Sequence, residues 1–229
     1  MRAFLRFTLI SATLLFAAAA HALSLDALTN KDTAAGLKEA LTQGAAKAVT
    51  LLGKQDGFLG NSKVKIPLPE SLHQVEGLMR GLGMGKYADE LVTTMNRAAE
   101  AAVPEAKALL GNSIQQMSVQ DAKAILTGGD DAATQYFRRT TSAALSVKFK
   151  PIVQKAMAKV KLADKYDEFA GKAARFGLVK ESDAHLENYV TQKALDGLYL
   201  MIAEEEKAIR KDPAGAAGNL ARKVFGALK

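Results

Sequence analysis

The sequence predicts an all-α protein packed around one long buried helix at about residues 186–209. Apolar residues recur at helical spacing along most of the chain, and no segment alternates with period two. Glycines and prolines divide this pattern into about eight or nine helical segments. The 229 residues contain no tryptophan and only 6% aromatic residues, so the core must consist mainly of aliphatic side chains and alanine. We therefore expect a single helical domain over residues 23–229.

Residues 1–22 are predicted to be a cleaved signal peptide outside this domain. Arg2 and Arg6 form a basic start, residues 7–20 are almost wholly apolar, and Ala20-His21-Ala22 places small residues at the two cleavage positions. The apolar run is short for a membrane span, and no stop-transfer segment follows it. We expect a periplasmic protein without a stable transmembrane segment after cleavage. Secretion outside the cell is a lesser possibility, and an uncleaved N-terminal anchor is the alternative to cleavage.

The charge and cysteine content exclude several classes of protein. Loss of Arg2 and Arg6 lowers the formal net charge from +7 to +5, and the remaining lysines and arginines form no basic tract interleaved with aromatic residues. Nucleic acid is therefore not an expected partner. Because the chain contains no cysteine, it can form no disulfide and carry no lipid on a cysteine.

The chain begins with a predicted helix from Asp32, its expected N-cap, to Leu52. Residues 53–65 then form a loop with three glycines, in which Phe58 and Leu59 are an isolated apolar pair. We interpret this pair either as an anchor in the core or as part of a lid over a cleft. A short extended piece is expected at 64–68, because Pro67 and Pro69 disfavour a helix there.

Two helices are predicted next, over residues 70–82 and 86–103, separated by Gly81, Gly83 and Gly85. The second has the clearest amphipathic pattern in the chain. Pro104 should break or kink it before a further helical stretch to about Gln116.

Residues 115–141 carry the densest local signals. Ser118 and Asp121 have the spacing of a capping box for a short helix. Gly128-Gly129 is expected to end that helix, since glycine tolerates positive φ. Asp130 or Asp131 should then cap the next helix. The result is a corner on which the remaining helices can pack.

The C-terminal half is expected to be helical throughout. Predicted helices cover 131–147 and 152–160, with a kink at Pro151, and then 163–176. The long helix over 186–209 is apolar nearly all round at its middle, which indicates burial. Asp212-Pro213 should begin a final helix that runs to Leu228.

Several segments of the chain resemble one protein family. They are Gly57-Phe58-Leu59-Gly60, Ile66-Pro67-Leu68-Pro69, residues 95–100 (MNRAAE), residues 121–126 (DAKAIL), residues 128–134 (GGDDAAT), residues 136–140 (YFRRT) and Asp196-Gly197-Leu198. The chain is similar, from about Gly36 to Gly226, to the domain of unknown function 4197 family of exported bacterial proteins. This resemblance implies a helical exported protein, and it brings neither an established activity nor catalytic residues.

The residues give little support to catalytic or metal chemistry, and no cofactor is expected. Glu70 and His73 form a single Glu-x-x-His pair, whereas carboxylate metal sites in helical bundles use two such pairs. No Gly-x-Ser-x-Gly motif marks a nucleophile. A phosphate cradle at Gly128-Gly129 is disfavoured by the two aspartates that follow.

A group of polar residues is the candidate binding site. On the long helix, Glu205 falls within the arc of Leu198 and Ile202, and Asp196 falls near Tyr189 and Leu200. A buried carboxylate requires a partner, and arginines on two other helices are available. The group is either a structural salt-bridge network or a site for a polar headgroup or peptide terminus. Its predicted residues are Arg97, Asp131, Tyr136, Arg139, Asp196 and Glu205, with Arg138 as a further partner.

The leading functional hypothesis is a non-enzymatic periplasmic protein that binds an amphipathic ligand or an envelope partner, either lipid or protein. One alternative is an enzyme that acts on cell-wall or lipid material through an acidic pair, Asp130/Asp131 or Asp196/Glu205. Another is a structural or assembly protein of the envelope, which would form a defined oligomer.

Overall fold

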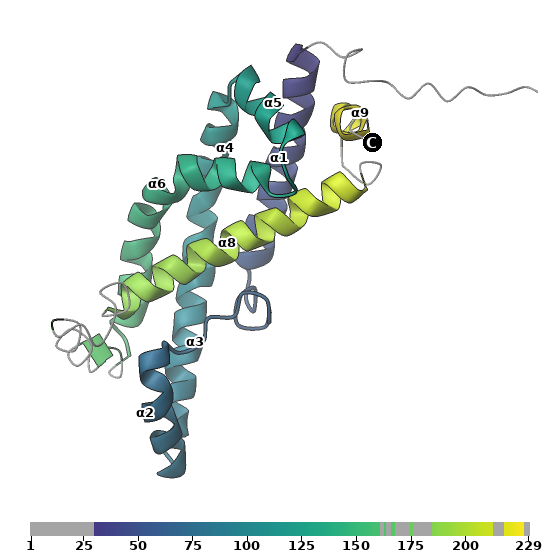
Figure 1. Cartoon of the computed structure of the whole chain (residues 1–229). Helices are drawn as coiled ribbons and strands as arrows, with labels where there is room; N and C mark the ends of the chain where they lie inside the picture. The colour runs from purple at the N-terminus through teal and green to yellow at the C-terminus, as the bar shows by residue number, and fades with distance from the viewer. Residues whose placement is uncertain are drawn as a thin grey trace, which may run out of the picture.

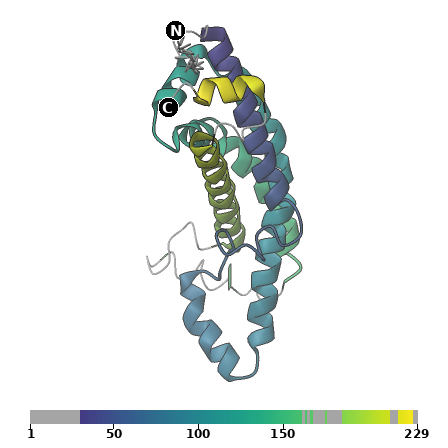
Figure 2. The same cartoon turned by 90° about the vertical axis from the view of Figure 1, so that its right-hand side faces the viewer.

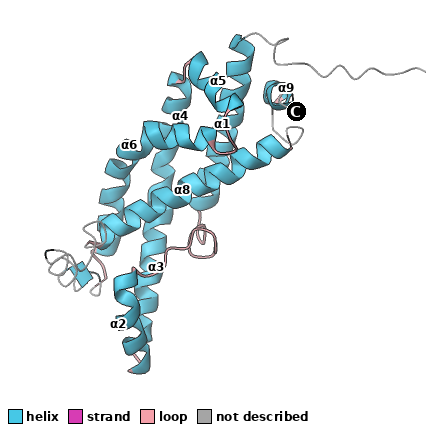
Figure 3. Ribbon diagram, in the orientation of Figure 1, coloured by secondary structure: helices cyan, strands magenta, loops and turns pink. Residues whose placement is uncertain are grey.

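The structure, a computed structural model, describes residues 30–160, 163, 166, 167, 175, 185–212 and 218–226. This part of the chain is all-α and contains no strand (Figure 3), which confirms the predicted fold class. The number of helices is close to the expected eight or nine. They are α1 (Asn30–Leu52), α2 (Glu70–Gly81), α3 (Gly85–Ala102), the 3-10 helix η2 (Val103–Glu105), α4 (Ala106–Gln116), α5 (Val119–Thr127), α6 (Ala132–Met157), α8 (Leu186–Lys211) and α9 (Asn219–Gly226).

Helix boundaries agree closely with the sequence prediction in the N-terminal half. α1 begins at Asn30 instead of after Asp32, which lies in its first turn. Pro104 converts the end of α3 into η2, after which α4 continues as predicted. Most of the helix predicted over 163–176, together with Pro213 and Leu228, lies outside the described residues.

α8 is the central helix, as predicted. Figure 1 shows it crossing the molecule, and it packs on α6 most extensively and also on α1 and α3. Val190, Ala194 and Leu198 on this helix are fully buried. The burial expected on nearly all sides of its middle was wrong on part of one side, because Leu200 and Asp196 are both partly exposed, although Tyr189 is buried.

α2 and α3 form an antiparallel hairpin that projects from the rest of the molecule. Figures 1 and 2, at right angles, both place its turn at the end opposite to α5 and α9. α2 packs on the first half of α3, whereas the second half of α3 enters the core and contacts α6 and α8. Met95 and Ala99 in this second half are fully buried. The turn itself, at residues 82–84, is exposed.

The corner between α5 and α6 forms, but for different reasons than predicted. The capping box is confirmed, since Ser118 Oγ accepts from Asp121 N at 3.0 Å and Asp121 Oδ2 accepts from Ser118 N at 3.1 Å. The expectation of positive φ was wrong, because Gly128 is extended at φ −81° and ψ −178°. Glycine is needed there by close approach: an added Cβ would lie 2.7 Å from Ala132 Cβ.

The N-terminus of α6 is capped by a residue from α8. Asp131 occupies the N-cap position but makes no side-chain capping bond. Instead, the buried Glu206 carboxylate accepts hydrogen bonds from Ala133 N and Thr134 N, each at 2.9 Å. The carboxylate therefore neutralises the positive end of the α6 dipole from a position 72 residues away.

Arg210 connects the same carboxylate to the end of α5. It lies one turn after Glu206 on α8, bonds Glu206 Oε1 at 2.9 Å and donates to the carbonyl of Ile125 at 2.8 Å. One buried ion pair thus satisfies donors at the start of α6 and an acceptor at the end of α5.

α6 continues through Pro151 as one helix instead of dividing there. Three successive hydroxyls, those of Thr140, Thr141 and Ser142, donate to carbonyls one turn earlier. Such bonds bend helices. Figure 1 shows α6 changing direction along its length.

No helix in the described residues is sufficiently long and apolar to cross a bilayer.

Candidate functional site

The structure does not gather the predicted polar residues into one site. It brings Arg139 onto Tyr136 and Arg138 near Asp196, and the other predicted residues belong to separate contacts. Arg97 bonds Glu100 and Asp56, Arg139 lies 3.7 Å from Asp121 and over the ring of Tyr136, Asp196 lies 3.5 Å from Arg138, Glu205 pairs with Lys47 at 2.7 Å, and Asp131 accepts from Gln135 at 2.9 Å. Asp196 therefore pairs with a cation of α6 and Glu205 with a cation of α1. The two carboxylates do not form one acidic pair.

The most buried carboxylates in the described chain are Glu206 and Glu100, and the sequence analysis placed neither in the candidate binding site. Helical projection placed Glu205 on the apolar arc of α8, although its neighbour Glu206 is the one that enters the core. An error of one residue corresponds to a rotation of 100° about the helix axis. The projection could not include the start of α6, whose backbone N–H groups are the partners that bury Glu206.

Glu100 fixes the glycine-rich loop on α3. Its Oε1 accepts from Phe58 N at 3.0 Å and from Leu59 N at 3.1 Å, and its Oε2 accepts from Arg97 at 2.6 Å. Arg97 in turn reaches Asp56 at 2.8 Å. Two backbone N–H groups of the loop therefore make charge-assisted hydrogen bonds to a buried carboxylate. In an exposed loop the same groups would bond to water.

The side chain of Phe58 enters the core beneath the loop. It is fully buried against Gly197 of α8, where an added Cβ would lie 2.7 Å from Phe58 Cε1. Asn96 fixes the following segment, since its Oδ1 accepts from Ile66 N and its Nδ2 donates to Ile66 O, both at 2.8 Å. This placement favours the anchor interpretation of Phe58.

The loop and the hairpin together border an open surface pocket of about 350 Å³, which we call the hairpin pocket. Its apolar lining comes from the loop and from α3: Leu59, Pro67, Leu68 and Val92. Its polar lining comes mostly from the two hairpin helices: Lys65, His73, Glu76, Arg80, Asp89 and Thr93. Leu59 is the one residue of the predicted lid and binding group that lines this pocket. Its neighbour Phe58 anchors the loop that carries it.

The charged side of the hairpin pocket is an organised ion-pair group. Arg80 bonds Glu76 at 2.8 Å and Asp89 at 2.6 Å, which links α2 to α3. The hydrogen bond from Arg80 holds the pKa of Asp89 below its usual value, and both carboxylates raise the pKa of Arg80. With Lys65 included, the pocket carries two cations and two anions, so its charges nearly cancel.

His73 is oriented by the loop. Its Nε2 donates to the carbonyl of Leu68 at 3.2 Å, which leaves Nδ1 as the second polar atom of the ring. Glu70, the partner in the Glu-x-x-His pair, is exposed and does not line the pocket.

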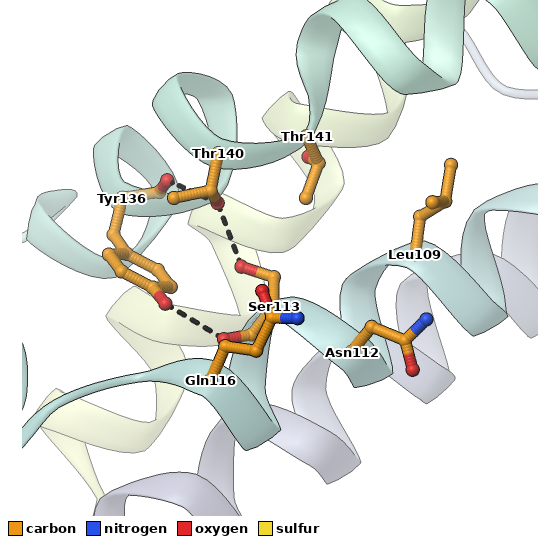
Figure 4. A pocket seen from close by; sticks show the side chains of 7 residues that line it. All are labelled: Leu109, Asn112, Ser113, Gln116, Tyr136, Thr140 and Thr141. Carbon is orange, nitrogen blue, oxygen red and sulfur yellow. Dashed lines mark hydrogen bonds between the residues drawn. The ribbon is translucent and has the colours of Figure 1, made fainter.

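A second, smaller cavity of about 220 Å³ lies between α4 and α6 (Figure 4). Its hydroxyls already have partners within the protein: Ser113 Oγ lies 2.7 Å from Thr140 Oγ1, and the Tyr136 hydroxyl donates to the backbone carbonyl of Ser113 at 2.8 Å. Tyr136 is the one member of the predicted polar group that lines either of these two cavities. The cavity has no charged side chain in its lining, and its hydroxyls fix α6 on α4.

Asp167, His185 and Glu187 bring their possible ligand atoms within 4.8 Å of one another. Asp167 accepts from the backbone N of Leu186 at 2.9 Å and so caps the first turn of α8. The positive end of that helix disfavours a cation at the same place. The position of Asp167 beside His185 and Glu187 is therefore explained by its capping of α8.

Sequence reasoning could not locate the hairpin pocket, because its lining residues give no motif. Lys65, Arg80 and Asp89 are ordinary surface charges on the printed sequence. Only the loop path, fixed by Glu100 and Asn96, brings Leu59 and Leu68 opposite the hairpin. The Asn96 and Glu100 spacing, four residues apart on one face of α3, is the signal that could have indicated a docked segment.

Comparison with known proteins gives one positive result. No curated protein and no solved structure matches the chain. A family model matches residues 27–226, nearly the whole chain beyond the predicted signal peptide. The segments that suggested the resemblance are largely those that build the loop anchor and the α5–α6 corner. The chain belongs to the family described as protein of unknown function, DUF4197.

Proposed function

We propose that the protein is a non-enzymatic binding protein of the cell envelope, and that an amphipathic ligand occupies the hairpin pocket. The observation that carries this proposal is the division of the pocket into an apolar side and a charged side. A ligand with an apolar portion against Leu59 and Val92 would place its head near Lys65 and Arg80.

The charges of the pocket restrict which kind of headgroup the ligand can carry. Arg80 already bonds two carboxylates, so a purely anionic group would meet Glu76 and Asp89 as well as the guanidinium. A zwitterionic head can address Lys65 with its anionic part and Asp89 with its cationic part. We therefore favour a zwitterionic amphiphile.

The volume limits how much of the ligand is enclosed. About 350 Å³ lies at the lower end of the ~300–1,000 Å³ usual for ligand pockets. That space holds a headgroup and the beginning of a chain. The proposal is therefore a surface site that holds part of a ligand.

The export predicted from the sequence supports the same proposal. A cleaved signal at residues 1–22 would place the pocket in the periplasm, where membrane lipids and their fragments are available. The intact mass of protein recovered from the envelope tests this point, and a mass that includes residues 1–22 would contradict it.

Binding of lyso-phosphatidylethanolamine, below its micelle concentration, is the direct test. We expect saturable binding by calorimetry to protein purified without detergent from cells that express the full sequence. Thr93→Trp should weaken binding at least tenfold because the indole fills the pocket from its exposed edge. Lys65→Glu should weaken it by reversing the charge that meets the anionic part of the head.

Lys54→Glu is the matched control, since Lys54 is an exposed lysine of the same loop that does not line the pocket. It should bind like the unmodified protein. Absence of saturable binding, or equal losses in Lys54→Glu and Lys65→Glu at unchanged unfolding midpoints, would refute the proposal.

A further inference from the structure

The turn of the α2–α3 hairpin exposes three large apolar side chains. Leu82 is 70% exposed, Met84 43% and Tyr87 42%. We call these three residues the tip patch. Gly81 and Gly83 beside them have open space where a Cβ would lie, so nothing else in the described chain covers the turn. Three such residues at the most projecting point of a molecule indicate an interaction surface.

The chemistry around the tip patch is ordered along the hairpin. Leu82 and Met84 lie in the turn itself. Lys86 and Tyr87 follow in the first turn of α3, with the Lys86 ammonium 5.1 Å from the Tyr87 ring centre. The Arg80–Asp89 ion pair comes next. The order is apolar, then aromatic with cation, then ion pair, which is the order of groups from the acyl boundary outward at a membrane interface.

The charge of the tip favours one kind of surface. Residues 77–88 contain no acidic residue and two basic ones, Arg80 and Lys86. Arg80 pairs with Glu76 and Asp89, which lie farther from the turn and balance its charge, so Lys86 is the cation nearest the turn. A surface that is apolar beneath and negatively charged at its boundary is complementary to this arrangement.

A second copy of the chain is a poorer occupant. Two tips that met would bring two Lys86 side chains together. The three residues expose on the order of a few hundred Å² per copy, well below the ~1,200 Å² that a specific interface buries. A bilayer has no such minimum area, because each inserted side chain contributes separately.

We propose that the tip patch inserts into the interface of an anionic lipid bilayer. The dimensions agree with shallow insertion. From Tyr87 to Val92 is five residues of α3, or about 8 Å of helix, and interfacial segments enter by ~5–10 Å. The hairpin pocket would then lie at the level of the headgroups. The insertion itself does not depend on the pocket binding a ligand.

The absence of tryptophan allows a direct test with single-tryptophan variants. Leu82→Trp places the only indole in the tip, and Val147→Trp places it at an equally exposed apolar position on α6, where Val147 is 74% exposed. Protein is purified from the envelope of cells that express the full sequence, and its intact mass is recorded. Phosphatidylglycerol/phosphatidylethanolamine vesicles should shift the emission of Leu82→Trp to shorter wavelength. The emission of Val147→Trp should not move.

Co-sedimentation with the same vesicles gives the second measurement. Leu82→Asp should reduce the partition coefficient at least ~10-fold, since it removes an apolar side chain and introduces a charge of the wrong sign. Val147→Asp should leave the coefficient unchanged, and Lys86→Glu should reduce binding to anionic vesicles but not to neutral ones.

Several outcomes would overturn the inference. They are an unshifted Leu82→Trp spectrum, equal losses in Leu82→Asp and Val147→Asp, and a co-purifying protein that is lost in Leu82→Asp while vesicle binding stays the same. Equal binding to anionic and neutral vesicles would refute the role of charge. Because these variants leave the pocket lining intact, the lyso-lipid titration separates failure of this inference from failure of the proposed function.

Discussion

Replacement of Glu206 by glutamine tests the junction of α5, α6 and α8. The carboxylate accepts five hydrogen bonds: two from the backbone at the start of α6, one from Thr134 Oγ1 and two from Arg210. Its side chain is 3% exposed and that of Arg210 is 13% exposed. Glutamine keeps one acceptor oxygen but removes the charge, and it turns an amide donor toward groups that are donors themselves.

The expected loss can be estimated from this geometry. Removal of one partner of a buried ion pair costs ~3–5 kcal/mol, mainly because the other charge stays buried without compensation. We therefore expect Glu206→Gln to lower the free energy of unfolding by about 3–5 kcal/mol. For a chain of this size, that corresponds to a fall in Tm of roughly 6 °C or more.

Glu205→Gln is the control on the neighbouring residue. Glu205 pairs with Lys47, whose side chain is 68% exposed, so the pair is screened by water. A pair of this kind contributes ~0–1 kcal/mol. Both variants remove one negative charge from adjacent positions of α8. The difference between their free energies of unfolding therefore measures the contribution of burial and capping, because both variants have the same net charge.

Urea unfolding of both variants, followed by circular dichroism with m-values compared, provides the measurement. A double variant, Glu206→Leu with Arg210→Leu, separates the two contributions. It removes the uncompensated charge but leaves α6 uncapped, so it should recover to within ~1–2 kcal/mol of the unmodified protein. A loss below about 1 kcal/mol in Glu206→Gln, or an equal loss in Glu205→Gln, would refute the reasoning.

Three further predictions concern the loop and the capping box. Glu100→Gln should cost ~2–3 kcal/mol and speed amide exchange at Phe58, whose N–H loses a charged acceptor. Gly197→Ala should cost ~1–3 kcal/mol through overlap with the Phe58 ring, as measured by urea unfolding. Because hydrogen bonds from its capping serine hold the pKa of Asp121 down, the stability it contributes is present above its unfolded pKa and is lost as pH falls through the folded pKa. Asp121→Asn should therefore flatten the acid limb of the stability curve.

Each of these three predictions has a result that would contradict it. Gly111→Ala, on α4 with nothing within 4 Å of the added Cβ, should be neutral or stabilising by up to ~1 kcal/mol. If it destabilised the protein as much as Gly197→Ala, close approach to Phe58 would not be the cause. Unchanged exchange at Phe58 in Glu100→Gln would argue against the loop anchor. An acid limb of unchanged slope in Asp121→Asn would remove the pH argument.

The sequence predicted local structure well where the determinants were local. The capping box at Ser118, the end of α3 at Pro104 and the amphipathic face of α3 each depend on residues within two turns of one another, and each was confirmed. The N-cap of α6 could not be predicted in the same way. Asp131 was the local choice, and the actual acceptor is Glu206 on another helix.

The candidate site was less predictable than the fold. Tyr136 does line a cavity, but Arg97, Asp196 and Glu205 belong to three separate contacts. Helical projection selected Glu205 on α8, but it contains no information about the start of α6, which is the partner that buries Glu206. The hairpin pocket has no sequence signature, because its two sides come from a loop and a helical hairpin whose relative position is fixed by buried hydrogen bonds.

By itself, the sequence determined that the chain is helical, where most helices begin and end, and which family it belongs to. These properties follow from periodicity, caps and glycine or proline positions, which act over a few residues. Only the tertiary structure decided which charges are buried and which face a pocket. That choice depends on contacts such as Glu206 with α6 and Glu100 with the loop, which join residues 41 or more positions apart. Burial of a charge is stable only when such distant partners are in place, so no local pattern can reveal it.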